Sequence, residues 1–435
     1  MHYDLNYIKG NREALTNSIR RRFLNPPIKD PVERLIELNE SIKNLRKEVD
    51  TLRHERNVIS LEFSKKKGSS DKTFLRVENE ERKHVRDIME KTNIKEREIA
   101  LKEGEAEKLF LWLPNITSED APDGKDDTEN VELRKVGHLK KHDFEIQDHI
   151  LLCEKRGLVD IESAAKVAGS RFYYLKGKLV QLALALEMYS IVNLASKGYT
   201  PLMPPLMLKR EVYGGIAHLA TFEDALYRVT GAEDTGKEDR FLISTTEHPL
   251  IAMYANTSIP EKELPIKMVG VSLAFRREAG AHGKDQKGIF RVHQFNQTEQ
   301  IIFCKPEDAA GLHEEMLDNA EEMWKELDIP YRVVNVCAGD MGVRDVKQYD
   351  IEAYLYAQKA YREVGSFDNT TDWIARRLNI KYVKDGGDRA YVNTLDGTGL
   401  PIQRTLIAII ENYQQRDGTI KVPEALVKYT GFKEI

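Results

Sequence analysis

The chain has 435 residues, of which 41% are hydrophobic and 31% are charged, so we expect more than one domain and a large core. The formal charge of −5 excludes a globally basic protein, and any polyanionic partner must therefore meet a local basic patch. Three cysteines far apart in the sequence (Cys153, Cys304 and Cys337) exclude a disulfide scaffold and argue against a structural zinc site, and they favour a reducing compartment.

The sequence predicts neither a signal peptide nor a membrane anchor. The N-terminal residues lack the apolar segment that a signal peptide needs. The most apolar helical stretch, residues 179–195, carries Gln181, Glu187 and Ser190, which predicts a buried helix instead of a membrane span. We therefore expect a cytoplasmic protein without a membrane segment.

The first quarter of the chain predicts a long helical hairpin. Apolar residues recur in steps of three and four and form a heptad seam, at Leu35, Leu38, Ile42, Leu45, Val49, Leu52, Ile59 and Phe63. Pro31 is tolerated in the first turn of this helix, and Arg56 interrupts its seam. Residues 68–71 supply a turn, and a second helical pattern follows to about Phe110. Two helices joined by so short a turn must run antiparallel, as a rod of roughly 50 Å over about residues 30–110.

Charge along the hairpin leaves its purpose open. Residues 41–67 hold eight basic side chains (Lys and Arg) against four acidic ones, an excess near the tip of an otherwise acidic chain. A solvated coiled-coil face or a dimerisation rod explains this pattern as well as a nucleic-acid surface does, because charge runs are common on exposed helices. The hairpin alone therefore does not assign a function.

The remainder of the chain predicts a mixed α/β body. A polar, acidic linker follows Leu113 and marks a boundary, so we expect one domain over residues 1–112 and a second over 113–435. In the second domain we expect strands at 266–277, 290–303 and 331–336, and helices at 179–195, 307–327 and 404–414. The chain contains neither a GxGxxG sequence nor a P-loop sequence, which argues against a dinucleotide-binding fold.

Residues 275–299 carry the clearest chemical signal. Arg276 and Glu278, two apart on the first strand, share a face. One face of the returning strand carries a second set: Arg291, His293, Phe295, Gln297 and Glu299. Arginines from two strands on one surface suit phosphate, Phe295 offers a stacking surface for a base, and Glu299 suits an ammonium group. An amphipathic hairpin with a solvated charged face explains the same pattern equally well.

A resemblance separates these two interpretations. Residues 275–295 resemble the second signature motif of class II aminoacyl-tRNA synthetases, and 287–295 resemble the seryl-tRNA synthetase family in particular. Residues 198–205 resemble the first motif of the class, whose proline, here Pro205, lies at the dimer interface. Residues 164–173 and the helical hairpin also resemble the seryl family, so the resemblance covers nearly the whole chain. It implies an α+β fold, in which an antiparallel class II catalytic sheet flanked by helices follows a two-helix coiled-coil arm that binds tRNA.

Three further segments resemble pocket elements of this family. Residues 244–250 match its Thr-x-Glu element, although a threonine shortly before a glutamate also commonly caps a helix. Residues 361–372 match the element that holds the nucleotide and magnesium. Residues 394–404 match the third class II motif, which places Arg404 near a helix N-terminus, where the helix dipole favours phosphate.

The resemblance implies a role for each matching residue. Arg276 and Arg404 are the catalytic candidates. ATP is expected to contact Arg276, Arg277, Glu278, Arg291, Val292, Phe295, Glu363, Val364, Gly365, Ser366 and Arg404. Serine is expected to contact Thr245, Thr246, Glu247, Arg276, Glu299, Asp396 and Thr398. Glu363 and Ser366 are expected to hold Mg²⁺, and no structural zinc is expected.

Several positions depart from the family pattern. Asp396 stands where asparagine is common, Gln297 where lysine is common, and Gly365 where the first serine of a pair is usual. Residues 401–403 replace a run of small residues before the arginine of the third motif. These departures concern the local contacts of the pocket, chiefly those to the serine hydroxyl.

The resemblance implies a homodimeric enzyme with the activity of the seryl-tRNA synthetase family. We therefore expect the chain to couple ATP and L-serine to seryl-adenylate and pyrophosphate and to transfer the seryl group to the 3′-terminal adenosine of serine tRNA, with selenocysteine tRNA as a further candidate. A ligase that charges a carrier protein tends to lack the long arm, and a non-catalytic regulator would have lost Arg276, Arg291 and Arg404, all of which are present. The zinc-dependent variant of the enzyme is disfavoured because the cysteines are not clustered.

Overall fold

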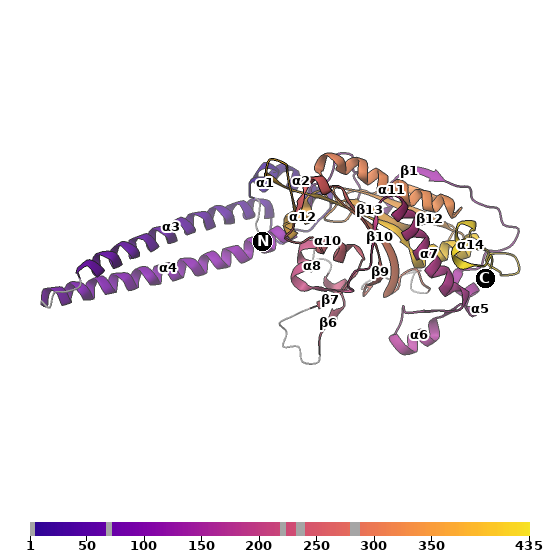
Figure 1. Ribbon diagram of the computed structural model, residues 1–435, viewed down its shortest axis with the longest axis horizontal. Helices are drawn as coiled ribbons and strands as arrows, with labels where there is room; N and C mark the ends of the chain where they lie inside the picture. The colour runs from indigo at the N-terminus through magenta and orange to yellow at the C-terminus, as the bar shows by residue number, and fades with distance from the viewer. Residues whose placement is uncertain (1–4, 67–71, 218–222, 232–239, 279–287) are drawn as a thin grey trace. The chain divides into compact units, whose positions relative to one another are not determined.

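A computed structural model of the chain describes residues 5–66, 72–217, 223–231, 240–278 and 288–435, apart from the side chains of 63–66 and 72–79 (Figure 1). The chain divides into two compact units. The first comprises Met1–Ile19 and Leu24–Leu113, and the second comprises Arg20–Phe23 and Pro114–Ile435. The expected turn at 68–71, the seam side chain of Phe63 and the loop residues 279–287 lie outside the described part.

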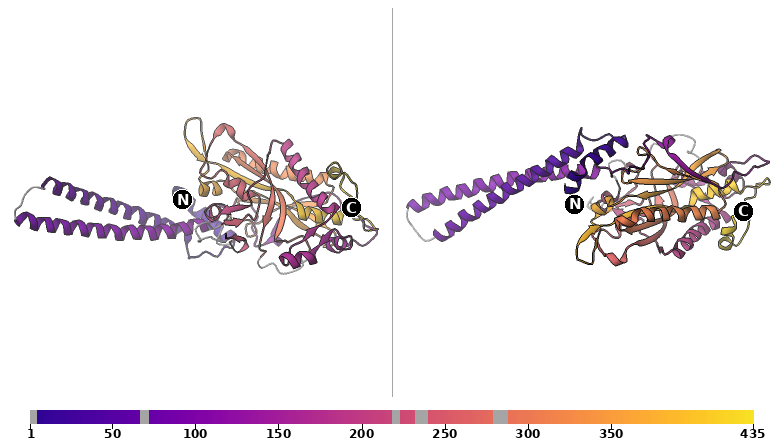
Figure 2. Two further views of the ribbon diagram at one scale, coloured as in Figure 1. Left: turned by 60° about the horizontal axis from the view of Figure 1, so that its bottom comes forward. Right: turned by 90° about the horizontal axis from the view of Figure 1, so that it is seen from above.

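Helices build the first unit. They are α1 (Leu5–Gly10), α2 (Arg12–Arg21, whose last two residues belong to the second unit), α3 (Pro31–Lys66) and α4 (Lys72–Trp112). Helices α3 and α4 lie side by side in every view and run antiparallel, which confirms the expected arm (Figures 1 and 2). Their buried apolar side chains include Val32, Leu35, Leu38, Ile42, Leu45 and Val49 from α3, with Ile88, Ala106, Leu109 and Phe110 from α4.

Ion pairs link the two helices of the arm outside this seam. Arg34 pairs with Glu105 at 2.8 Å, Arg46 with Glu103 at 2.6 Å and Arg53 with Glu96 at 2.8 Å. The side chains of these pairs are largely exposed and screened by water, so the pairs add little and the buried seam carries most of the stability. Two of the eight basic residues counted near the tip, Arg46 and Arg53, are therefore engaged with α4.

An eight-stranded sheet forms the centre of the second unit, with the strand order β1-β11-β12-β13-β16-β10-β9-β4. All neighbours are antiparallel except β4 and β9, and this confirms the expected antiparallel class II sheet. The strands are β1 (Val131–Val136), β4 (Thr200–Leu202), β9 (Ile266–Phe275), β10 (Gln294–Cys304), β11 (Tyr331–Asn335), β12 (Lys347–Leu355), β13 (Ala360–Asn369) and β16 (Asn393–Pro401).

Helices and three small sheets surround the main sheet in the described part of this unit. The helices are α5 (His149–Lys155), α6 (Ile161–Ala168), α7 (Lys178–Ser196), α8 (Arg210–Ile216), α10 (Glu247–Ala252), α11 (Ala309–Glu326), α12 (Trp373–Leu378), α13 (Ile402–Asn412) and α14 (Glu424–Thr430). The small sheets pair β2 (Val159–Asp160) with β3 (Tyr174–Leu175), β5 (Met207–Lys209) and β6 (Arg228–Val229) with β7 (Arg240–Leu242), and β8 (Ser258–Pro260) and β15 (Arg389–Tyr391) with β14 (Lys381–Val383).

The largest hydrophobic core lies between the main sheet and helices α7, α11 and α13 (Figure 2). Leu182, Trp324 and Ile407 represent the three helices in this core. Side chains alternate between the two faces of a strand, so the burial of Leu395 in the core directs Asp396 of β16 to the opposite face. The core thereby leaves one face of the sheet free to carry polar groups.

Helix α7 is the one helix in the described part of the chain that is long and apolar enough, by length and composition alone, to cross a membrane. One of its sides is buried in the core through Leu179, Leu182 and Leu186, which is the expected behaviour of a core helix. Its other side exposes four apolar residues at helical spacing: Val180, Leu184, Met188 and Val192.

The strand ends differ from the predicted ones at the loop that joins β9 to β10. Strand β9 ends at Phe275, so Arg276 and Glu278 lie beyond it and not on a shared strand face. Glu278 has a positive φ of 48°, which takes the backbone out of the extended conformation. Strand β10 begins only at Gln294, so Arg291 also lies in the loop. Alternation along a strand therefore does not explain how these side chains converge.

Candidate active site

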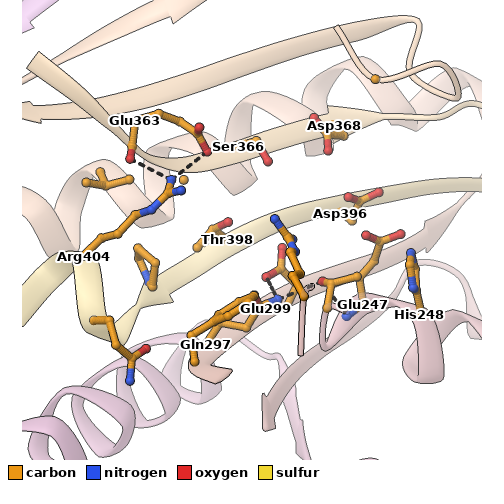
Figure 3. A pocket seen from close by; sticks show the side chains of 18 of the residues that line it. Glu247, His248, Gln297, Glu299, Glu363, Ser366, Asp368, Asp396, Thr398 and Arg404 are labelled. Atoms are coloured by element: carbon orange, nitrogen blue, oxygen red, sulfur yellow. Dashed lines mark hydrogen bonds and ion pairs between the residues drawn. The ribbon is translucent and has the colours of Figure 1, made fainter. Parts of the chain in front are cut away.

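A cavity of about 350 Å³ opens on the polar face of the main sheet (Figure 3). Its floor is built by β10, β13 and β16, which are adjacent in the sheet. The walls come from the start of α10 and the residues before it, the first turn of α13, the loop before β12, the end of α8, and the described parts of the loop between β9 and β10. Segments that are far apart in the sequence therefore contribute to a single site.

Two arginines converge at one end of this cavity. The Arg276 Nε donates a hydrogen bond to the Ser244 carbonyl oxygen at 2.9 Å, and its guanidinium lies 5.2 Å from the centre of the Phe295 ring. Arg404, the third residue of α13, pairs with the Glu363 carboxylate at 3.0 Å and lies 4.7 Å from the centre of the Phe290 ring. These contacts orient both guanidinium groups within the cavity.

The electrostatics of this end favour an anion. Burial, together with the positive charge of Arg404, lowers the pKa of Arg276 below its usual value. Arg404 also holds the pKa of Glu363 below its usual range, against the opposing effect of burial, so this carboxylate stays ionised. A polyanion with several charges would relieve the repulsion between the arginines, and guanidinium groups bind phosphate by paired hydrogen bonds.

Arg291 and Glu278 frame the mouth of the same end. Arg291 Nη1 lies 3.8 Å from the Glu278 carboxylate, and the Arg291 side chain is 43% exposed. Both residues line the cavity although neither lies on a strand. Val292, which also lines it, is buried and can offer only its backbone to a polar ligand.

The other end of the cavity is acidic and closely hydrogen bonded. Gln297 donates to the Thr245 hydroxyl and to the Glu299 carboxylate, both at 2.8 Å (Figure 3). Burial raises the pKa of Glu299 well above its usual value, and the charges of Asp396 and Glu247 raise it further. Gln297, which replaces a common lysine, thus positions two neighbouring groups without adding a positive charge.

The hydroxyl groups of the two threonines before α10 have different hydrogen-bond partners. The Thr245 hydroxyl accepts a hydrogen bond from the Glu247 backbone N–H at 3.3 Å and also lines the cavity. Thr246 is the residue that precedes the helix, yet its hydroxyl is hydrogen bonded to Ser272 at 2.7 Å. Thr245 therefore both accepts the hydrogen bond from the start of the helix and lines the cavity, whereas Thr246 does neither.

Most residues expected from the sequence meet in this one cavity. Those that line it are Thr245, Glu247, Arg276, Glu278, Arg291, Val292, Phe295, Glu299, Glu363, Val364, Gly365, Ser366, Asp396, Thr398 and Arg404. Three candidates do not. Thr246 faces Ser272, the exposed Arg277 makes a backbone bond to Ala225, and Pro205 is exposed between β4 and β5. His293, expected on the same face as Phe295, instead contacts the Arg276 carbonyl oxygen at 2.8 Å.

Sequence reasoning missed Arg344 and Asp368 as pocket residues. Both line the cavity, and they pair with each other at 3.4 Å. Asp368 lies two residues after Ser366 on β13, so strand alternation would have placed it on the same face. Arg344 lies in an irregular loop between β11 and β12, where no periodicity gives a signal.

Comparison with known proteins agrees with this architecture. The family described as tRNA synthetase class II core domain (G, H, P, S and T) matches residues 227–413. The family described as Seryl-tRNA synthetase N-terminal domain matches residues 3–117, which include the helical arm. The fold and the cavity thus define a class II aminoacyl-tRNA synthetase.

Individual relatives narrow this class to one family. The chain is 45% identical to the serine–tRNA ligase of Pyrococcus furiosus, over 99% of this chain and 97% of that protein. It superposes with a TM-score of 0.88 on the seryl-tRNA synthetase of Pyrococcus horikoshii complexed with ATP, at 39% identity, over 100% and 99% of the two chains. The cytoplasmic serine–tRNA ligase of Naegleria fowleri in complex with AMP gives 0.83 at 34% identity, over 100% of this chain and 99% of that one. The chain belongs to the seryl-tRNA synthetase family, which confirms the resemblance found in its sequence.

Proposed function

We propose that this chain activates L-serine with ATP and transfers the seryl group to the 3′-terminal adenosine of serine tRNA. The observation that carries this proposal is one cavity with two converging arginines, Arg276 and Arg404, at one end and the carboxylates Glu247 and Glu299 at the other. Such a cavity suits a triphosphate and an amino acid held end to end. Membership of the seryl-tRNA synthetase family supports the same reaction.

In the first step, a carboxylate oxygen of serine attacks the α-phosphorus of ATP, and pyrophosphate leaves with the electron pair of the broken P–O bond. No protein nucleophile is needed, because catalysis consists of positioning and of stabilising the negative charge that accumulates on the phosphate oxygens. Arg276, at the nucleotide end, bridges the serine carboxylate and the α-phosphate. Arg404 holds the distal phosphates at the N-terminus of α13, and Phe295 stacks on the adenine.

In the second step, the terminal ribose hydroxyl of tRNA attacks the seryl carbonyl carbon, and AMP leaves. The serine ammonium group is held by Glu299 and Glu247, with Thr245 and Thr398 completing the pocket. Hydrogen bonds to the serine hydroxyl favour serine over alanine, since alanine would leave a buried polar group unpaired.

Mg²⁺ fits the donor set at the nucleotide end. Glu363 offers an ionised carboxylate, and Ser366, which also lines the cavity, offers a hydroxyl. Oxygen ligands of this kind, completed by phosphate oxygens and water, are those that Mg²⁺ prefers. The ion would supply countercharge to the phosphates when bound, while Arg404 holds the Glu363 carboxylate in place.

The partners follow from the two units of the chain. We assign residues 1–112 to tRNA binding and 113–435 to catalysis, with the arm contacting tRNA mainly through shape and phosphates. A homodimer is supported by the exposed apolar face of α7 (Val180, Leu184, Met188 and Val192), because such a stripe is costly in water. The exposed Pro205 belongs to the proposed interface. A cytoplasmic location and the use of selenocysteine tRNA stay predictions.

The proposed function is tested by ATP–pyrophosphate exchange with each amino acid in turn, followed by charging of purified serine tRNA. We expect exchange with serine and transfer to serine tRNA. Exchange with another amino acid alone would contradict the assigned substrate. Transfer to an acyl-carrier protein without transfer to tRNA would favour a carrier-protein ligase, which the match of the N-terminal family to residues 3–117 does not support.

Serine binding is expected to weaken as the pH falls. The pKa of Glu299 is raised by burial, Asp396 and Glu247, while Arg276 and Arg344 oppose the rise, and the net effect lies well above the usual carboxyl value. The protonated form, which predominates below this raised pKa, cannot pair with the ammonium group. We therefore expect kcat/KM for serine to rise with pH through an inflection above the usual value of about 4.3 for glutamate.

This pH dependence has an internal control in the second substrate. The pKa of Glu363 at the nucleotide end is lowered, so KM for ATP should stay flat over the range in which kcat/KM for serine changes. The measurement is exchange kinetics for both substrates between pH 5.5 and pH 9, on the native chain and on Glu299→Gln. An unchanged serine inflection in the Gln variant would assign the titration to another group.

A further inference from the structure

Arg344 lies at the acidic end of the cavity and forms ion pairs with carboxylates from three of the surrounding elements. Its side chain, 17% exposed, forms an ion pair with Glu247 at the start of α10. Its Nη2 lies 2.8 Å from Asp396 on β16 and 3.4 Å from Asp368 on β13. Its Nε lies 3.4 Å from Asp345, the next residue in the chain. One guanidinium thus joins the helix segment above the cavity to the two strands below it.

The carboxylates around Arg344 depend on its charge. Burial raises the pKa of Asp396 well above its usual value, and Arg344 is the strongest opposing influence. Glu247 differs, because Arg344, His248 and Arg276 together outweigh the effect of burial there, and the net pKa lies below its usual value. Arg344 is the strongest of the three influences that keep the Glu247 carboxylate ionised.

Hydrogen bonds from other segments of the same unit hold the backbone of the loop that carries Arg344. Arg22, a buried residue of the same unit, donates to the Gly342 carbonyl oxygen at 2.7 Å and to that of Asp345. The Asn115 side chain donates to the Arg344 carbonyl oxygen at 2.7 Å. A Cβ atom on Gly342 would collide with the Asp345 carboxylate, so the loop also needs glycine at this position. The backbone of Arg344 is fixed before any ligand binds.

Asp396 keeps one carboxylate oxygen available. Its Oδ1 is bonded to Arg344, whereas its buried Oδ2 has no hydrogen-bond partner. Asp396 lines the cavity two residues before Thr398 on the same strand face. An unpaired buried oxygen is costly, and a substrate hydroxyl that donates to it removes this cost. The available oxygen therefore matches a short amino acid that carries a donor on its side chain.

We propose that Arg344 is a positioning and specificity-determining residue for the amino-acid substrate. It draws Glu247 and Asp396 together, which fixes the carboxylate that receives the substrate ammonium group and the oxygen that accepts its hydroxyl. Because its side chain spans from α10 to β16, Arg344 also closes the acidic end of the cavity. The space that remains fits a three-carbon amino acid, so larger amino acids are excluded. This inference rests on the proposed function and names the group that selects its amino acid.

The test compares Arg344→Met and Arg344→Lys with the native chain in pyrophosphate exchange. Removing one partner of a buried ion pair leaves the others uncompensated, so we expect Arg344→Met to raise KM for serine by about 10–100-fold. KM for ATP should stay within about twofold, because Arg344 does not lie among the residues of the nucleotide end. Arg344→Lys keeps the charge but not the forked geometry, so its KM for serine should lie between those of the native chain and Arg344→Met. The ratio of threonine to serine exchange should rise in both variants.

Two further measurements separate positioning from a loss of folding. In the Arg344→Met background, Asp396→Asn should restore part of the serine affinity, because the amide removes an uncompensated buried charge while its oxygen can still accept the hydroxyl. The serine pH profile of Arg344→Met should move to higher pH, because Glu247 loses its main cation. Arg332→Met is the matched control, since Arg332 on β11 pairs with Glu352 and Glu132 outside the cavity.

The outcomes distinguish an error in the role of Arg344 from an error in the proposed function. Unchanged serine KM in Arg344→Met, or equal losses for serine and ATP, would overturn the role of Arg344. Absence of serine exchange in the native chain would instead refute the proposed function. In that case the same variants are measured with whichever amino acid supports exchange, and an unchanged KM for it would overturn the role of Arg344 as well.

Discussion

Replacing Arg276 with alanine is expected to reduce serine-dependent ATP–pyrophosphate exchange by about 10³–10⁵-fold, the range typical of an arginine that stabilises a phosphoryl-transfer transition state. Its guanidinium is the one proposed to bridge the two substrates at the bond being formed. The binding of serine tRNA should stay within about twofold, because phosphate contacts made elsewhere dominate nucleic-acid affinity. The measurements are exchange kinetics and tRNA affinity at one fixed salt concentration.

The geometry of Arg276 makes this loss specific. The bond from Nε to the Ser244 carbonyl oxygen and the stacking over Phe295 hold the side chain in one orientation. Lysine keeps the charge but cannot make the paired hydrogen bonds, so Arg276→Lys should recover only a small part of the activity. Such preorganised charge is effective because it needs no rearrangement during the reaction.

A matched arginine provides the control for Arg276. Arg332→Ala removes an arginine of the same sheet that lies outside the cavity, and exchange should stay within about twofold of the native rate. If Arg276→Ala kept its exchange activity and lost only tRNA binding, the assignment of Arg276 to the chemical step would be wrong.

Shortening the helical arm is expected to have the opposite effect. In a variant in which residues 50–93 are replaced by a short Gly-Ser turn, kcat/KM for charging of serine tRNA should fall by at least about 100-fold, because the phosphate contacts of the arm are lost. Serine-dependent exchange should stay within about threefold, since none of the arm residues that the structure describes lines the cavity. The buried seam residues Leu35, Leu38, Ile42 and Leu45 are retained and hold the remaining stump together.

Substituting two lysines on the arm gives a finer test than removing the arm. Lys43 and Lys47 are exposed on α3. Replacing both with glutamine keeps the helix propensity nearly constant and removes two charges. If each contacts a phosphate, the slope of log affinity against log salt should decrease by about one per lysine. Equal charging by the shortened and the native chain would refute the role of the arm in tRNA binding.

Much of the architecture was predictable because its signals are local. The seam from Leu35 to Val49 repeats with the period of a coiled coil, so it indicates a hairpin without knowledge of any partner segment. The alternation of Phe295, Gln297 and Glu299 along β10 correctly places all three on one face, and all three line the cavity. Periodicity of this kind depends only on neighbours along the chain.

The errors occurred where the chain leaves regular structure. Arg276, Glu278 and Arg291 were expected on strands, yet they lie in the loop between β9 and β10 and reach the cavity through irregular backbone. Thr246 was expected to contact serine, but it does not line the cavity and its hydroxyl is hydrogen bonded to Ser272 on β9. The spacing of residue types along the sequence does not predict hydrogen bonds between segments that are far apart in it.

The sequence by itself determined the helical arm, the polar strands and the family to which the chain belongs, since each is indicated by a pattern among residues that are close along the chain. Only the tertiary structure decided that Arg344 joins Glu247 to Asp396, because these residues come from three separate parts of the chain. The physical reason is that the state of a buried carboxylate depends on the charges packed around it. Those neighbours are chosen by the folding of the whole sheet and not by adjacency along the chain.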